Sequence, residues 1–179
     1  MITSIANEKV RYVRSLSRRR VRYREKRFVI EGVRLVEEAF RAGVLPALLF
    51  YSGERDVFSG SEELLTKIQA SEIPAFAVSE KVMKAMTATI SPPGILAVAP
   101  FPELTPPPNP SLILVVDGLR DPGNLGTILR SAEAAGVRLA ILAPKTVDHY
   151  NPKVVRGAMG AHFRLPISIM SWTQIAEAL

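Results

Sequence analysis

The segment 117–130 combines a turn signal at 121–124 and two loop glycines with two polar side chains, Asn124 and Arg130. The glycines let a ligand approach the backbone, and the helix that begins here offers unpaired amides and its positive dipole end to a phosphate. Arg130 lies about 9 Å along the helix axis from Asn124, and its long side chain leans back toward the loop. These residues predict an anion site. The alternative interpretation is that Asn124 caps the helix and Arg130 is a solvated surface charge.

The first 27 residues are strongly basic. Ten basic and two acidic side chains give them a net charge of +8, whereas the remaining 152 residues carry −2. This density is typical of a surface that binds a polyanion, and the forked arginine side chain suits phosphate. RNA or DNA is therefore the expected partner, and the alternative is a solvated terminus without a specific partner. Five arginines are candidate RNA contacts: Arg18, Arg19, Arg20, Arg22 and Arg27. Tyr12 and Tyr23 lie in the same run and could stack on bases.

A second candidate segment, 151–166, begins with Asn-Pro, which predicts a short helix with proline in its first turn. Small residues at 157–161 predict close packing of this backbone against another element or a ligand. Lys153 and Arg156 are candidate RNA contacts, although single charges of this kind are often only solvated. His162 is predicted to be a hydrogen-bonded packing residue rather than a catalyst.

Several classes of chemistry are disfavoured by what the sequence lacks. There is no cysteine, and two histidines are the only soft ligands, so we expect no metal site and no cysteine nucleophile. Neither a Gly-x-Gly-x-x-Gly loop nor a Gly-Lys-Ser/Thr motif follows the strand that precedes Asp117. No apolar run approaches the roughly 18 residues needed to cross a bilayer, and the first residues are too charged for a secretory signal. We therefore expect a cytoplasmic protein without a membrane partner.

The elements that must position these residues form an α/β pattern. In the first hundred residues, apolar strand-like runs alternate with helical periodicity, which predicts helices covering a sheet. The expected strands are 28–30, 47–51, 75–78 and 94–99, and the expected helices are 33–42, 62–69 and 81–86. Prolines concentrated in 101–110 predict an extended spacer. The predicted organisation is thus a domain over 1–100, a linker over 101–110 and a second domain over 111–179.

The second domain begins with a βαβ pattern. A buried strand at 112–116 is followed by the turn, a helix that Gly136 ends, and a second strand at 137–143. The apolar face of this helix is expected to comprise Leu125, Ile128, Leu129, Ala132 and Ala135. Such a unit predicts parallel strands joined by a right-handed crossover, with a ligand site at their carboxyl ends. Asn124 lies at that end.

Four segments, in order, resemble the SpoU/TrmH family of RNA ribose 2′-O-methyltransferases, which belongs to the SPOUT superfamily. Residues 117–136 resemble the family's first motif, with Asn-x5-Arg followed by Ser-Ala-Glu-Ala-Ala-Gly, and 151–166 resemble the stretch before its cofactor loops. Phe-Val-Ile-Glu-Gly at 28–32 and Ser-Pro-Pro-Gly-Ile-Leu-Ala at 91–97 are similar to the opening and close of an L30e-like RNA-binding domain. The resemblance covers the whole chain.

The resemblance implies an L30e-like domain followed by a parallel-sheet SPOUT domain of the α/β-knot type. It implies methyl transfer from S-adenosylmethionine to a ribose 2′-hydroxyl, without a metal. Arg130 would contact the target phosphate and help activate the hydroxyl, and Asn124 would position the loop and the ribose. The implied substrate is RNA, with ribosomal RNA of the 23S type preferred. Full-length family members are expected to be homodimers, whereas a dimer of this chain is not predicted.

The chain departs from the family pattern at its carboxyl end. The Gly-x-Glu-x-x-Gly-Leu loop and the Ser-Leu-Asn-Val-Ser segment, which supply most of the donor pocket and the knot, do not occur in the sequence. We therefore expect a truncated SPOUT domain, without a knot or tight donor binding, whose cofactor-binding residues are unknown. Calorimetry on residues 1–179 that found micromolar binding of S-adenosylmethionine would contradict this expectation.

Two other functions are compatible with parts of the sequence. A non-catalytic RNA-binding protein would use the L30e-like domain and the basic arm, and nothing in 1–100 excludes it. A metabolic enzyme for a small acidic substrate explains neither the arginine run nor the four ordered resemblances.

Overall fold

The computed structural model describes residues 1–54 and 56–178. The chain forms two compact units, Met1–Phe101 and Pro102–Leu179, each with its own core. Within the described residues, every helix is too short or too polar to cross a membrane.

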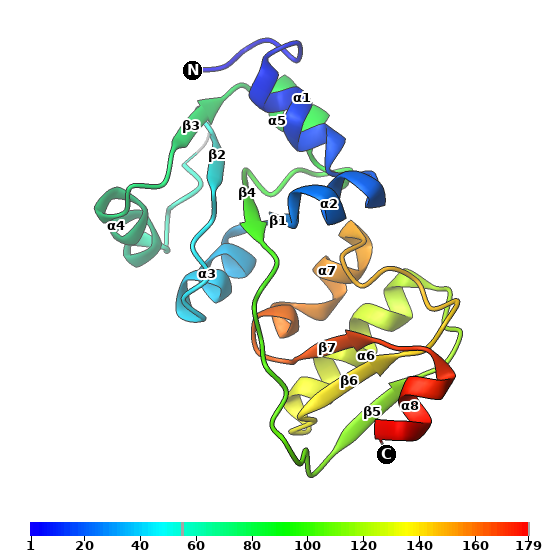
Figure 1. Cartoon of the computed structure of the whole chain (residues 1–179). Helices are drawn as coiled ribbons and strands as arrows, with labels where there is room; N and C mark the ends of the chain where they lie inside the picture. The colour runs from blue at the N-terminus through cyan, green and yellow to red at the C-terminus, as the bar shows by residue number, and fades with distance from the viewer. Residues whose placement is uncertain (55, 179) are drawn as a thin grey trace. The chain divides into compact units, whose positions relative to one another are not determined.

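The first unit is built on a four-stranded sheet with the order β1-β4-β2-β3 (Figure 1). β4 pairs antiparallel with both β1 and β2, whereas β2 and β3 are parallel. The strands are β1 (Arg27–Glu31), β2 (Leu48–Ser52), β3 (Ala75–Val78) and β4 (Ile95–Pro100). At the free edge of β3, Ile2 adds a short parallel bridge to Val78.

Helices cover both faces of this sheet. α1 (Glu8–Ser15) and α5 (Glu80–Met86) share a core with alternate residues of the strands, such as Phe50 and Leu96. The opposite alternation buries Phe28, Ile30, Leu49 and Ile95, and α3 (Val33–Arg41) packs against β1 and β4. The remaining helices of this unit are α2 (Arg19–Glu25) and α4 (Glu62–Ala70).

The second unit contains a parallel sheet with the order β5-β6-β7. Its strands are β5 (Ile113–Val116), β6 (Leu139–Leu142) and β7 (Ile167–Ile169), and its helices are α6 (Pro122–Ala134), α7 (Pro152–Ala158), the 3-10 helix η1 (Ala161–Phe163) and α8 (Trp172–Ala178). α6 and α7 bury their apolar residues against one face, whereas Ile175 of α8 packs on the other with Leu139 and Ile141. This arrangement confirms the predicted α/β fold with a parallel sheet.

Three elements and one residue differ from the sequence-based expectation. The basic segment contains α1 and α2, which were not predicted because arginines interrupt their apolar spacing. β7 was also not predicted, because a strand of three residues is too short to show alternation. Ala135 was expected on the apolar face of α6 but is exposed, since the helix ends at Ala134.

Candidate functional site

The loops after β5 and β6 are joined to each other at the carboxyl edge of the parallel sheet. The carbonyl of Val116 accepts hydrogen bonds from the Ala143 amide at 2.9 Å and from the Thr146 hydroxyl at 3.1 Å. The Val147 amide donates to the Leu119 carbonyl at 2.8 Å. Because backbone groups make most of these bonds, the edge has a defined shape that depends little on side-chain identity.

Asp121 fixes the beginning of α6. Its carboxylate accepts a hydrogen bond from the Asn124 amide at 2.7 Å, and Pro122 occupies the first turn. This is an N-cap, which satisfies one of the free amides at a helix start. The alternative that Asn124 itself is the cap is therefore wrong. The Asn124 side chain is exposed and makes no hydrogen bond with the part of the chain that the structure describes.

Two glycines let α6 and α7 touch through their backbones. A Cβ atom on Gly126 would lie 2.6 Å from the Val154 carbonyl oxygen and 2.9 Å from the Gly157 Cα. A Cβ atom on Gly157 would lie 3.2 Å from the Gly126 Cα. A side chain on Gly126 would therefore overlap the backbone of α7, and one on Gly157 would require the backbone of α6 to shift by a few tenths of an ångström. The predicted close packing around Gly157 is confirmed, but its partner Gly126 could not be identified from the sequence.

This crossing brings Lys153 over the first turn of α6. The Lys153 Cε and Nζ atoms lie 3.3 Å and 3.6 Å from the position of a Cβ on Gly123. Asn151 caps α7 by accepting a hydrogen bond from the Lys153 amide at 2.9 Å. The exposed ammonium group of Lys153 thus stands near the turn that carries Asn124.

Arg130 lies on the solvent side of α6, two turns beyond the cap. It lies six positions after Asn124, which places it about 9 Å along the axis and about 120° around it. Its guanidinium group is exposed and makes no hydrogen bond or ion pair with residues 1–54 or 56–178. Asn124 and Arg130 therefore share one accessible helix without contacting each other, so a ligand that meets both must span the exposed first turns of α6.

Other polar residues of this unit are partly buried or paired within the fold. Arg156 is half-buried, and Arg164 pairs with Glu133 at 2.8 Å. His162 is 3% exposed, and its Nε2 lies 2.8 Å from the His149 carbonyl oxygen, so Nε2 carries the proton and donates. Burial lowers the pKa of His162 to about 4, although the His149 carbonyl and Asp148 act in the opposite direction. His162 is therefore neutral at neutral pH, and its predicted packing role is confirmed.

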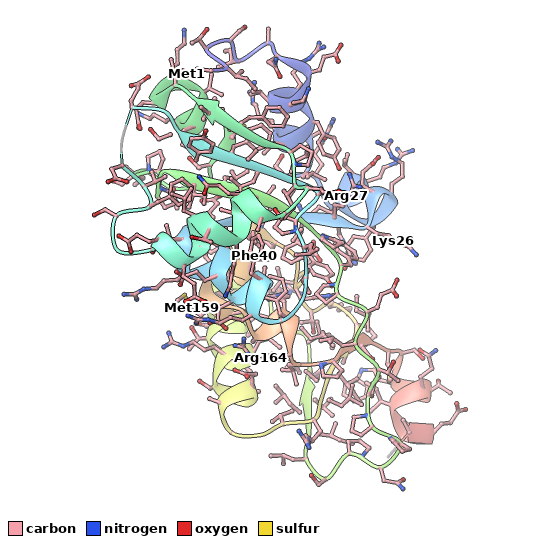
Figure 2. All side chains as sticks on the ribbon, turned by 90° about the vertical axis from the view of Figure 1, so that its left-hand side faces the viewer. Met1, Lys26, Arg27, Phe40, Met159 and Arg164 are labelled. Atoms are coloured by element: carbon pink, nitrogen blue, oxygen red, sulfur yellow. The ribbon has the colours of Figure 1, made fainter. Side chains whose placement is uncertain are left out.

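Four of the five predicted RNA contacts of the first unit are at least partly accessible to solvent. Arg18, Arg19 and Arg20 are exposed between α1 and α2. Arg27 is half-buried at the start of β1, next to the exposed Lys26 (Figure 2). Its Nη1 lies 3.4 Å from the Tyr12 hydroxyl.

Arg22 differs from the other four arginines. It is 3% exposed, and its Nη1 donates to the carbonyls of Leu16 at 2.8 Å and Ser17 at 2.7 Å. It was expected at the surface because a run of arginines shows no difference between its members in sequence. The structure corrects this expectation, since Arg22 stabilises the end of α1. Tyr23 is also engaged, because Arg19 stacks on its ring at 5.2 Å and Phe101 meets its ring at 5.4 Å.

Comparisons with known proteins agree with this geometry. Residues 111–179 match the SpoU rRNA methylase family, and residues 7–97 match the MRM3-like substrate binding domain. A crystal structure of an RNA 2′-O ribose methyltransferase aligns with 98% of the chain and 67% of its own length, at 34% identity and a TM-score of 0.77. The chain belongs to the SpoU rRNA methylase family.

Two further relatives show how much of the family the chain represents. The 23S rRNA (guanosine(2553)-2′-O)-methyltransferase RlmP of Bacillus subtilis is 35% identical over 93% of the chain and 63% of its own length. The AdoMet-bound rRNA methyltransferase of Sinorhizobium meliloti is 30% identical over 99% of the chain and 67% of its own length, with a TM-score of 0.81. The chain spans between 39% and 63% of the first curated relatives it matches.

Proposed function

We propose that this SpoU family member methylates ribose 2′-hydroxyls in ribosomal RNA with S-adenosylmethionine as the methyl donor. The observation that carries the proposal is the exposed pair Asn124 and Arg130 on α6, at the carboxyl edge of a parallel sheet. The names of the relatives support the substrate and the donor. RlmP is a 2′-O-methyltransferase of 23S rRNA, and the Sinorhizobium meliloti structure contains AdoMet.

The reaction requires a ribose hydroxyl to become a better nucleophile. When bound, S-adenosylmethionine supplies the methyl group. Arg130 binds the phosphate next to the target ribose. It also stabilises the negative charge that develops on the ribose 2′-oxygen. Asn124, whose carboxamide can both donate and accept hydrogen bonds, positions the ribose, and Lys153 adds a second positive charge. Because an arginine stays protonated, we assign Arg130 electrostatic positioning rather than proton abstraction, and the hydroxyl proton is released to solvent water.

The exposed side chains of this edge suit a phosphate and a sugar better than the donor. Asn124, Arg130 and Lys153 are polar and solvent-accessible, and none of them provides an apolar wall for an adenine ring. We therefore assign no described residue to S-adenosylmethionine. The first unit, with the basic residues of α1 and α2, is proposed to be an RNA-binding domain of the L30e type. We further propose that the whole protein acts as a homodimer.

Arg130 is the residue that tests this function. Ribosomal RNA from a strain lacking the gene is incubated with labelled S-adenosylmethionine and the whole gene product in which residues 1–179 occur. We expect Arg130→Ala to lower the rate about 100-fold or more, and Arg130→Lys to lower it at least about tenfold, because lysine cannot hold phosphate in a bidentate manner. Ribose methylation is recognised by resistance of the adjacent phosphodiester to alkali.

The matched control is Arg138→Ala. Arg138 is also exposed, but it precedes β6 and so lies at the amino ends of the strands. Its loss is expected to leave the rate unchanged. A full rate with Arg130→Lys would refute the assigned role of Arg130. RNA binding by the wild-type protein without any methyl transfer would favour the non-catalytic alternative.

A further inference from the structure

Three consecutive arginines are held at the turn between α1 and α2. Arg18 is the N-cap residue of α2 with an extended backbone, and its side chain makes no cap hydrogen bond. Arg19 and Arg20 follow in the first helical turn, which contains no acidic residue. All three side chains are exposed. Like charges at adjacent positions repel, and cations are unfavourable at a helix start, so this arrangement needs a restraint in the free protein.

The restraint is the buried side chain of Arg22. A single guanidinium nitrogen, Nη1, donates to two consecutive carbonyls, those of Leu16 and Ser17, at the end of α1. Leu16 is fully buried in the core with Val10 and Val13. Burying a guanidinium group is costly unless it is hydrogen-bonded, and an apolar residue would fill the same space at lower cost. The bonds of Arg22 thus fix the direction in which the chain leaves α1.

A second contact restrains the same surface. The Arg19 guanidinium lies 5.2 Å from the centre of the Tyr23 ring, and this ring meets Phe101 edge-on at 5.4 Å. An arginine that is already ordered loses less side-chain entropy when it binds a phosphate. The turn therefore presents its positive charges in a preorganised form.

We propose that Arg22 is a positioning residue for RNA binding. It holds Arg18, Arg19 and Arg20 as one surface that binds successive phosphates of an RNA backbone, and it does not touch the RNA itself. The inference rests on the proposed function in one respect, because it requires that the substrate is RNA. It adds to that function by assigning the RNA contact to a defined turn and by giving Arg22 an indirect role in it.

The test measures the affinity of residues 1–179 for a fluorescein-labelled RNA hairpin of mixed sequence at several KCl concentrations. Arg22→Leu removes the hydrogen bonds to the Leu16 and Ser17 carbonyls and puts an apolar side chain of moderate size in the same space. We expect an approximately tenfold weaker affinity at about 0.1 M salt. We also expect the slope of log K against log salt to fall by about 1 to 2, because roughly 0.7 to 0.9 is lost per released phosphate contact.

Val13→Ala is the matched control, since Val13 is buried in the same core but its apolar side chain forms no hydrogen bond to the turn. It destabilises the first unit and should leave the salt slope unchanged. Adding Arg22→Leu to a variant with Arg18, Arg19 and Arg20 all changed to Ala should cause no further loss, because Arg22 acts through these three side chains. If Arg22→Leu does not fold, Arg22→Gln, which retains one donor, takes its place with an expected loss of about threefold.

Three results would overturn the proposal: wild-type affinity and slope in a folded Arg22 variant, an equal change of slope in Val13→Ala, or an additive loss in the combined variant. A wild-type chain that does not bind the hairpin would remove this inference together with the RNA substrate. If the wild-type chain binds the hairpin and the Arg22 variants bind it equally well, only this inference is wrong, and the RNA substrate stands.

Discussion

The two regions that carry exposed cations are held in place by different means. At the carboxyl edge of the parallel sheet, backbone hydrogen bonds join the loops, and two glycines let α6 touch α7. At the α1–α2 turn, one buried arginine side chain holds two carbonyls. The close contact of α6 with α7 depends on glycines, which have no side chain. The α1–α2 turn depends on the side chain of Arg22.

This difference predicts opposite sensitivities to substitution. Adding a single methyl group should disturb the edge of the second unit, because the backbones of α6 and α7 already touch. Removing atoms should disturb the α1–α2 turn, because its carbonyls would lose their donor. Trp172 is the single tryptophan of the chain and lies in the second unit. Its fluorescence therefore follows that unit, whereas circular dichroism follows both.

The largest effect on stability is expected from Gly126→Ala. The new Cβ would lie 2.6 Å from a backbone oxygen, and neither helix can move without disturbing the core that both share. We expect the free energy of unfolding of the second unit to fall by about 3 kcal/mol. Urea denaturation followed by Trp172 fluorescence measures this change.

Gly123→Ala is the matched control on the same helix. A Cβ there would meet the flexible end of Lys153 at 3.3 Å and the Asp121 carboxylate at 3.1 Å, and alanine favours a helix more than glycine does. We expect a change below about 1 kcal/mol. Equal losses in the two variants would mean that the contact between Gly126 and Gly157 does not determine how α6 and α7 pack.

The sequence was sufficient for most of the elements and for placing Asn124 and Arg130 on the helix after the turn, because both depend on local patterns. Alternating apolar runs predicted most strands and helices, and a turn before a periodic segment predicted the start of α6. The pairing of Gly126 with Gly157 could not be predicted, since it depends on how two helices cross. The burial of Arg22 was missed for a similar reason, because it depends on where the carbonyls at the end of α1 point.

Acid should destabilise the second unit through its buried histidine, which has no counterpart at the α1–α2 turn. Both histidines lie in the second unit, and the pKa of buried His162 is about 4, below the ordinary value of 6.5. The unfolded chain then binds more protons than the folded one between these values, so stability rises with pH across this window and is lost as pH falls. We expect the second unit to lose about 2 kcal/mol from about pH 8 to about pH 5, as measured by denaturation at each pH.

His162→Gln provides the control for this pH dependence. Glutamine can still donate to the His149 carbonyl, but it does not titrate. The variant should therefore show a smaller loss of stability in acid at the Trp172 signal. The first unit contains no histidine, so the α1–α2 turn should contribute no histidine-dependent change over the same range. An identical pH profile in wild type and His162→Gln would show that His162 is not the group responsible.

Asp121→Ala is expected to lower stability less than Gly126→Ala or acid does, but it links the carboxyl edge of the sheet most directly to function. It removes the carboxylate that accepts a hydrogen bond from the Asn124 amide, and loss of such an N-cap costs about 1 kcal/mol. Because the cap fixes the turn that carries Asn124, methyl transfer by the whole gene product should fall more than stability does, by about tenfold or more. Asp121→Asn can still cap the helix and should recover most of both losses. If Asp121→Ala lowered the stability but left the methylation rate intact, the cap at the start of α6 would have a structural role only, and the position of Asn124 would not limit methyl transfer.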